Sequence, residues 1–254
     1  IRLILDIFKP DQGQVSILGG PMTEEKKDRI GYMPEERGLY QDAPLDTCLV
    51  YLGTLKGLPA SEAQARLGPY LERFDLAHAR HNKVKELSRG MQQKAQIIST
   101  VLHDPELVIV DEPFSGLDPV NTQLVKELMD ELRAAGTTIV MSTHMLHQVE
   151  ALCDRMALID DGRNVLYGPL DEIRRAHTGN AVRVRVAGEL PPLDGVEGVT
   201  ERNGWLQLAL APGTEPQAVL AQLLGRTRVE HFEIAVPSLD EIFIRTVKRE
   251  RREA

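Results

Sequence analysis

Hydrophobic residues in the first hundred positions recur mainly at the spacing of α-helices. Residues 1–8 carry apolar side chains at this spacing, although no capping residue precedes them. The same period predicts three further helices, over residues 45–55, 61–74 and 88–102. Ser61 and Ser88 stand where side-chain caps of the second and third of these helices are expected. We therefore expect a compact helical lobe over about residues 43–103.

Short apolar runs separated by amphipathic helices follow this lobe. The runs predict strands at residues 107–110, 138–141 and 155–159, with helices at residues 120–134 and 145–152. A turn at Asp161-Gly162 then returns the chain as a hairpin. Two earlier strands are expected at residues 14–18 and 29–33. Apolar strands that alternate with helices indicate an α/β fold, in which a parallel sheet is buried on both faces.

The character of the chain changes after residue 175, at a polar segment over residues 176–180 that we interpret as a linker. Beyond it, Val182 begins an alternation of apolar and polar residues that is typical of a half-buried strand. Further strands are expected at residues 205–210 and 229–236, with helices at residues 216–224 and after Ser238. We predict a larger domain over residues 1–175 and a small α+β domain over residues 182–254.

Composition limits the kind of protein that this chain can be. Its 254 residues carry a formal net charge of −8, which gives no support for nucleic-acid binding. Cys48 and Cys153 lie far apart without metal-ligand spacing, and we interpret both as small buried hydrophobic residues. No apolar run approaches the roughly 18 residues that a membrane-spanning helix needs. A role at a membrane would therefore require a partner chain.

Two adjacent carboxylates, Asp111 and Glu112, follow the buried strand at residues 107–110. Ligands of α/β proteins bind at the carboxyl ends of such strands, where one acid can hold Mg²⁺ and its neighbour can polarise a water molecule. The pair alone fits two acids that simply end a strand and start a loop. Pro113 and the sequence SGLD over residues 115–118 favour the catalytic interpretation.

Four more residues, in three segments of the chain, are candidate site residues. Ser88 and Gly90 open a helix, where a hydroxyl, a close backbone approach and the helix N-terminus favour phosphate; the alternative is a capped helix without a ligand. His144 follows a strand, where a lone histidine is often only a satisfied polar residue. Asp118 precedes Pro119 and fits the N-cap of the next helix.

The order of these motifs, LSRG, DEP, SGLD and a strand-end histidine, resembles that of the ATP-binding cassette (ABC) family. The resemblance implies a P-loop NTPase-type parallel sheet with a helical subdomain, and the cofactors ATP and Mg²⁺. It makes Asp111 the Walker-B aspartate, Glu112 the catalytic glutamate and His144 the switch histidine. Ser88 and Gly90 resemble the signature that contacts the γ-phosphate of ATP held by the opposite subunit. Asp118 resembles the D-loop aspartate, which crosses the dimer interface.

The chain departs from the family's usual motifs at three positions. Arg89 and Met91 replace a glycine and a glutamine of the signature LSGGQ. Glu35 stands where the Q-loop usually has glutamine, and the resemblance makes it a metal ligand. A carboxylate binds the metal more strongly than an amide does but repels phosphates. The alternative is that Glu35 is a surface acid.

The phosphate-binding motif GxxxxGK[ST] does not occur in these 254 residues. Because the later motifs are present in order, we expect that the sequence is truncated before or within the Walker A region. The resemblance covers about residues 1–168. Residues 237–247, PSLDEIFIRTV, resemble the C-terminal extension of cassette ATPases of drug or sodium exporters, the type-2 group.

The resemblance implies an ATPase that dimerises around ATP, as a homodimer or with a paired ABC ATPase subunit, and powers a separate integral membrane permease, as an exporter. Such a subunit would be cytoplasmic and peripheral on the inner face of the cell membrane, without a nucleic-acid partner. One alternative is a soluble cassette ATPase that acts on ribosomes or DNA, although a second cassette and a long coiled coil are absent from the sequence. The other is an inactive fragment that does not bind ATP alone.

Overall fold

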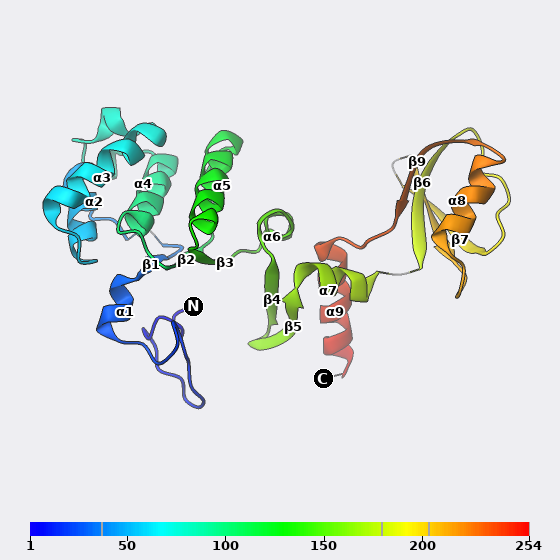
Figure 1. The fold of residues 1–254 in the computed structure, drawn as a ribbon, viewed down its shortest axis with the longest axis horizontal. Helices are drawn as coiled ribbons and strands as arrows, with labels where there is room; N and C mark the ends of the chain where they lie inside the picture. The colour runs from blue at the N-terminus through cyan, green and yellow to red at the C-terminus, as the bar shows by residue number, and fades with distance from the viewer. Residues whose placement is uncertain (37, 179, 203, 254) are drawn as a thin grey trace. The chain divides into compact units, whose positions relative to one another are not determined.

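A computed structural model of the chain describes residues 1–36, 38–178, 180–202 and 204–253 (Figure 1). The chain forms two compact units, Ile1–His144 and Met145–Ala254. This division differs from the predicted domain boundary at residues 175–182, which stays a prediction. No helix in the described ranges combines the length and the apolar character needed to cross a bilayer.

A parallel sheet organises the first unit. Its strands are β1 (Ile30–Met33), β2 (Leu107–Asp111) and β3 (Thr138–Ser142), in the order β1-β2-β3. The central strand buries Val108, Ile109 and Val110 in succession, as expected for a strand covered on both faces. The predicted parallel arrangement of these strands is confirmed.

Three helices form the lobe beside this sheet: α2 (Leu45–Thr54), α3 (Ala60–Arg73) and α4 (Arg89–Val101), joined by 3-10 turns at Ala77–Ala79 and Val84–Glu86. Their core includes the fully buried Phe74, Leu67 and Leu49. Ser88 caps α4, as predicted. Ser61 does not cap α3, because that helix begins one residue earlier, directly after Pro59.

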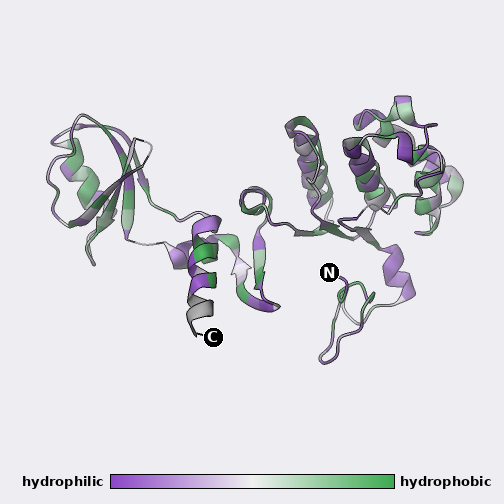
Figure 2. Cartoon of the chain, turned by 180° about the vertical axis from the view of Figure 1, so that it is seen from behind, coloured by the Kyte–Doolittle hydropathy of each residue, from purple (hydrophilic) through white to green (hydrophobic). Residues whose placement is uncertain are grey.

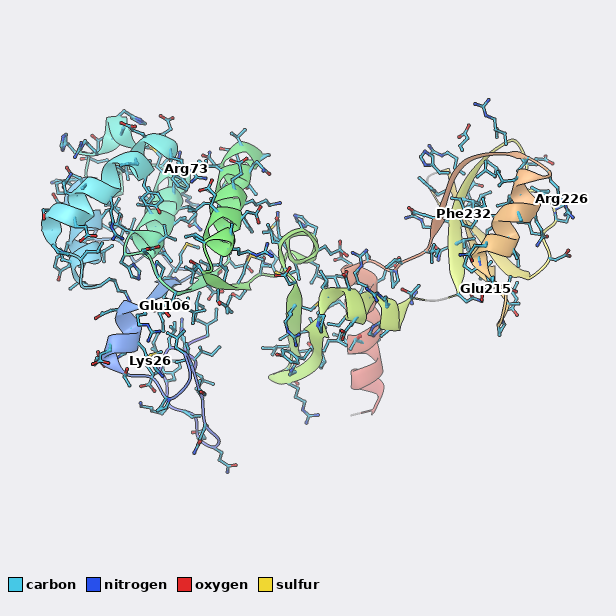
Figure 3. All side chains as sticks on the ribbon, viewed as in Figure 1. Lys26, Arg73, Glu106, Glu215, Arg226 and Phe232 are labelled. Atoms are coloured by element: carbon cyan, nitrogen blue, oxygen red, sulfur yellow. The ribbon has the colours of Figure 1, made fainter. Side chains whose placement is uncertain are left out.

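Helix α5 (Pro119–Ala134) connects β2 to β3 and buries Val125, Leu128 and Met129. Arg73 of α3 binds Glu131 of α5 through both carboxylate oxygens, at 2.5 and 2.8 Å. Arg73 lies between the two helices in Figure 3. This bidentate pair therefore ties the lobe to the helix that follows β2.

Two predictions for the first twenty residues are wrong. Residues 1–8 form turns instead of a helix: Leu5 N donates to Ile1 O at 3.0 Å, but Asp6 takes a φ of 61°. A single helical turn fixes several dihedral angles for one hydrogen bond, so it is not stable alone. Residues 14–18 form no strand, and Ile17 makes only an isolated bridge with Gly20. The next segment, helix α1 (Glu24–Asp28), buries no residue and is largely hydrophilic (Figure 2).

The second unit contains a hairpin, a four-stranded sheet and four helices in its described residues. The hairpin of β4 (Arg155–Asp160) and β5 (Arg163–Pro169) packs with α6 (Leu146–Leu152), α7 (Leu170–His177) and α9 (Leu239–Glu253). The antiparallel sheet has the order β7-β8-β6-β9, from β6 (Ala181–Ala187), β7 (Val196–Arg202), β8 (Trp205–Leu210) and β9 (Arg228–Ile234). Helix α8 (Pro216–Leu224) covers one face through Val219 and Leu223. Strand β7 and helix α7 were not predicted, and Gly179 of the predicted linker lies outside the described residues.

His103 is buried just after α4, and neither ring nitrogen has a hydrogen-bond partner among the described residues. Burial, and then the charge of Lys56, lower the pKa of His103 from 6.5 to about 4. The unfolded chain binds this proton more readily, so stability is lost as the pH falls from 6.5 toward 4.

We expect His103 to account for about 3 kcal/mol of the stability lost between pH 7 and pH 4. Urea unfolding of the wild type and of His103→Leu at both pH values measures this contribution. An equal loss of unfolding free energy in the two proteins would contradict it.

Candidate functional site

The candidate site lies at the carboxyl edge of the parallel sheet. The register pairs Met33 with Val110 and Asp111 with Ser142, so the three strands end nearly level with one another. Glu35 follows β1 by two residues, and His144 follows β3 by two residues. The fold therefore brings three predicted site residues, Glu35, Asp111 and His144, to one edge, where open α/β sheets bind ligands.

Asp111 ends β2 with a half-buried side chain. The hydroxyl of Ser142, on the neighbouring strand, donates to Asp111 Oδ1. On the other side, burial and then the charge of Asp111 raise the pKa of Tyr32. Asp111 thus has a defined direction and places its charge at the end of the sheet.

Glu112 turns sharply away from the strand, with a φ of 48°. Its backbone N–H still pairs with Ser142 O at 3.0 Å. A non-glycine residue in the left-handed region carries a conformational cost, which functional sites often retain. The turn directs the Glu112 carboxylate toward the loop after β3.

Two residues of the loop after β3 hold the Glu112 carboxylate. Thr143 Oγ1 donates to Glu112 Oε2 at 3.1 Å, and the His144 backbone N–H donates to Oε1 at 2.8 Å. His144 Nδ1 lies 2.7 Å from the same Oε1. The Glu112 side chain is only 15% exposed, whereas that of His144 is 81% exposed. The acid is therefore fixed and partly shielded, while the imidazole stands in solvent.

The contact with Glu112 determines which His144 nitrogen is available. A carboxylate accepts hydrogen bonds, so Nδ1 is the protonated nitrogen in this geometry. In a neutral imidazole, Nε2 is then a hydrogen-bond acceptor, and it becomes a donor when the ring is charged. Either state leaves Nε2 directed away from Glu112.

The N-terminus of α4 lies against the loop that follows the two acids. Ser88 Oγ accepts a hydrogen bond from Met91 N at 3.3 Å. A side-chain carbon at Gly90 would lie 3.6 Å from the Gly116 carbonyl oxygen, an ordinary contact distance. Ser88 and Gly90 thus lie on the exposed or half-exposed end of a helix of thirteen residues.

Asp118 caps α5, as the sequence predicts. Its Oδ1 accepts from Asn121 N at 2.9 Å and its Oδ2 from Asn121 Nδ2 at 2.5 Å. The backbone and side-chain hydrogen bonds of Asn121 hold the pKa of Asp118 below its ordinary value. Its contact with a second subunit stays a prediction.

Glu35 lies in an exposed loop and lines an open cavity of about 450 Å³. The other lining residues are Glu36, Gln41, Gln92, Gln93 and Ser115. Sequence reasoning missed the contribution of the α4 glutamines, which are buried although they are polar. The sequence alone gives little signal for this, because Gln92 and Gln96 share a helical face with Ser88, Ser99 and Thr100, which is typical of a solvent-exposed face.

The residues at this edge fit one mode of Mg²⁺ binding. Within the described ranges, no three His, Cys, Asp or Glu residues gather as a complete metal cage. Asp111 and Glu35 supply two carboxylates at the ends of adjacent strands. Mg²⁺ usually binds one or two protein carboxylates and takes its other ligands from water and phosphate. The two acids fit that mode.

Two family models match the chain. The model described as ABC transporter matches residues 1–115. A second model, described as ATP-binding protein DrrA1-3-like, C-terminal domain, matches residues 168–247. The chain therefore has the features of this family in both of its units.

Curated relatives match over nearly the whole chain. The uncharacterized ABC transporter ATP-binding protein YhaQ of Bacillus subtilis is 41% identical, over 97% of this chain and 84% of its own length. The daunorubicin resistance ATP-binding protein DrrA3 of Streptomyces coeruleorubidus is 30% identical, over 99% and 84%. The Nod factor export ATP-binding protein I of Sinorhizobium fredii is 30% identical, over 99% and 75%. These relatives confirm the predicted resemblance to the type-2 group.

Solved structures agree with the sequence relatives. A structure described as the ATP binding subunit of an ABC transporter has a TM-score of 0.65 and 35% identity, and it covers 69% of this chain and 74% of that one. The cbiO1 protein of Clostridium perfringens shares the fold, with a TM-score of 0.57 over 69% and 73%. The predicted α/β fold of P-loop NTPase type is thereby confirmed. With an identity of 41% to YhaQ across most of both sequences, the chain belongs to the ATP-binding proteins of ABC transporters.

Proposed function

We propose that this chain is the ATP-hydrolysing subunit of an ABC exporter, which dimerises around ATP and powers a separate membrane permease. The observation that carries the proposal is the geometry of Glu112, held by Thr143 and His144 beside Asp111 at the carboxyl edge of the sheet. A carboxylate fixed by several donors is placed to act on one defined water molecule. The same edge carries Glu35, the second expected metal ligand.

Asp111 and Glu35 would hold Mg²⁺ at this edge. When bound, the ion neutralises negative charge on the phosphates of ATP. Ser142 keeps the Asp111 carboxylate in one direction through its hydroxyl. The protein therefore supplies orientation, and the charge of Glu35 adds attraction for the ion that an amide would not supply.

Glu112 is the proposed general base of hydrolysis. Its carboxylate accepts hydrogen bonds from Thr143 and His144 and would accept a proton from the attacking water. His144 Nε2 is oriented by the contact of Nδ1 with Glu112 and would contact the γ-phosphate. The hydrogen-bonded contact between His144 Nδ1 and Glu112 orients both groups relative to each other.

We propose that Ser88 and Gly90 bind the γ-phosphate of ATP held by a second subunit, either a copy of this chain or a paired ABC ATPase. The exposed N-terminus of α4 offers backbone N–H groups and a partial positive charge to an anion. Asp118 would lie at the interface of the two subunits while it caps α5.

The names of two relatives support the proposed direction of transport. DrrA3 is named for daunorubicin resistance and the Nod factor protein for export. We propose by analogy an export function and a position on the inner face of the cell membrane, bound to the permease. We also propose residues 1–175 as the ATPase domain and residues 182–254 as an accessory domain.

The proposal is tested on the protein expressed from its complete gene. We expect Mg²⁺-dependent release of phosphate from ATP, and an ATP-dependent doubling of the mass measured by light scattering. A protein with neither property would refute the proposed function.

The 254 residues alone are expected to bind ATP more weakly than micromolar, because no GxxxxGK[ST] loop occurs among them. That loop normally supplies backbone N–H groups and a lysine to the phosphates. Isothermal titration calorimetry of this chain with ATP and Mg²⁺ measures the affinity. Micromolar binding would show that other residues replace the loop.

A further inference from the structure

Helix α4 buries three glutamines. The amide of each one donates hydrogen bonds to backbone carbonyls outside the helix. Gln92, Gln93 and Gln96 are 8, 5 and 3% exposed. A buried amide without a hydrogen bond costs about 1–3 kcal/mol, so each of these side chains needs a partner. The partners lie in three different loops, and each glutamine therefore fixes a separate segment to the helix.

Gln96 holds the loop that carries Glu35. Its Nε2 donates to Pro34 O at 2.9 Å and to Glu36 O at 3.3 Å. These two carbonyls flank Glu35, so a single side chain fixes the backbone on both sides of that acid. Gln96 Oε1 has no partner among the described residues. The two N–H groups of the amide therefore make the observed contacts.

Gln93 makes the equivalent contact with the neighbouring loop. Its Nε2 donates to Pro113 O at 3.1 Å, one residue after Glu112. The loops after β1 and β2 are thus both hydrogen-bonded to the same face of α4. The position of Glu35 relative to Asp111 depends on this shared support, because Glu35 itself lies in an exposed loop.

We propose that Gln96 is a positioning residue for Glu35, which it holds in the direction needed to share a metal ion with Asp111. This inference rests on the proposed function. Attraction between a carboxylate and a cation falls with distance. Without the hydrogen bonds from Gln96, the loop would allow the Glu35 carboxylate to occupy many positions. Supporting residues of this kind commonly change metal affinity by 10–100-fold when they are removed.

The first test follows the loop itself and needs neither metal nor ATP. We expect Gln96→Met, which keeps the length of the side chain but removes both donors, to lower the backbone NMR order parameters of residues 35 and 36. Ser99→Ala is the matched control, since it removes a side-chain hydrogen bond, from Ser99 Oγ to Gln96 O at 2.7 Å, within the same helix. Equal order parameters at residues 35 and 36 in all three proteins would overturn the positioning role of Gln96.

The second test measures metal binding in the protein from the complete gene, in a Glu112→Gln background that preserves bound ATP. Mn²⁺ dissociation constants are determined by electron paramagnetic resonance. We expect Gln96→Met to weaken binding by roughly tenfold and Ser99→Ala to leave it unchanged. In a Glu35→Gln protein, adding Gln96→Met should have no further effect.

Independent, multiplying effects of Gln96→Met and Glu35→Gln would overturn the inference, because Gln96 would then act through another group. If Gln96→Met does not fold, Gln96→Asn carries the same test, since its shorter amide cannot reach both carbonyls. Failure of the proposed function is read separately: wild-type protein without Mg²⁺-dependent hydrolysis refutes the ATPase, whereas the order parameters of residues 35 and 36 still decide whether Gln96 holds the loop.

Discussion

Replacing Glu112 by glutamine is expected to reduce ATP turnover by roughly 10²–10⁴-fold while ATP-dependent dimers persist. The amide keeps the size of the side chain and can still accept from the His144 backbone N–H. It cannot take a proton from water, which is the role proposed for the carboxylate. Phosphate release and light scattering with ATP measure the two properties on the protein from the complete gene.

The matched control is Glu106→Gln. Glu106 directly precedes β2, whereas Glu112 follows it, and the Glu106 carboxylate forms an exposed ion pair with Arg29 at 2.6 Å (Figure 3). Exposed pairs contribute about 0–1 kcal/mol, so this change should leave turnover near that of the wild type. Normal turnover in Glu112→Gln would remove that residue from the proposed role.

Replacing Gly31 by alanine is expected to destabilise the first unit by about 3 kcal/mol. Gly31 lies in β1, and an added Cβ would lie 2.2 Å from the backbone oxygen of Thr100 in α4. A backbone atom cannot rotate away as a side chain can, so the helix and the strand must separate. Urea unfolding followed by circular dichroism measures the change in the free energy of unfolding.

Gly198→Ala is the matched control for this prediction. Gly198 lies in β7, and an added Cβ would lie 3.8 Å from the Cβ of Ala209, an ordinary contact distance. Glycine costs a strand about 0.5–1 kcal/mol relative to alanine, so this variant should be at least as stable as the wild type. Equal stability of the Gly31→Ala protein and the wild type would show that α4 does not depend on this close approach.

The sequence predicts the elements whose pattern is set by their own residues. The apolar run before Asp111 predicts β2, and the Ser88 hydroxyl and the Asp118 carboxylate cap α4 and α5 as expected. Capping and burial of a central strand are local or strongly periodic effects, which a single sequence contains. Residues 1–8 have a helical period as well, but period alone does not stabilise a single turn.

The parts of the site that depend on distant contacts could not be predicted in this way. The φ of 48° at Glu112 is supported by pairing with Ser142 and by hydrogen bonds from Thr143 and His144, about thirty residues away. Gln96 looks unfavourable on a buried helical face until its carbonyl partners at residues 34 and 36 are known. These positions combine a locally unfavourable choice with a tertiary contact that compensates it.

The close contact between Gly31 and Thr100 packs one end of α4 tightly against β1. Thr100 lies near one end of the helix and Ser88 at the other, about 18 Å away at 1.5 Å per residue. A tilt of α4 by about 5° around the contact at Thr100 would move Ser88 by about 1.6 Å, while Thr100 itself would move little. Small rotations there would therefore be amplified at the phosphate-facing end of the helix.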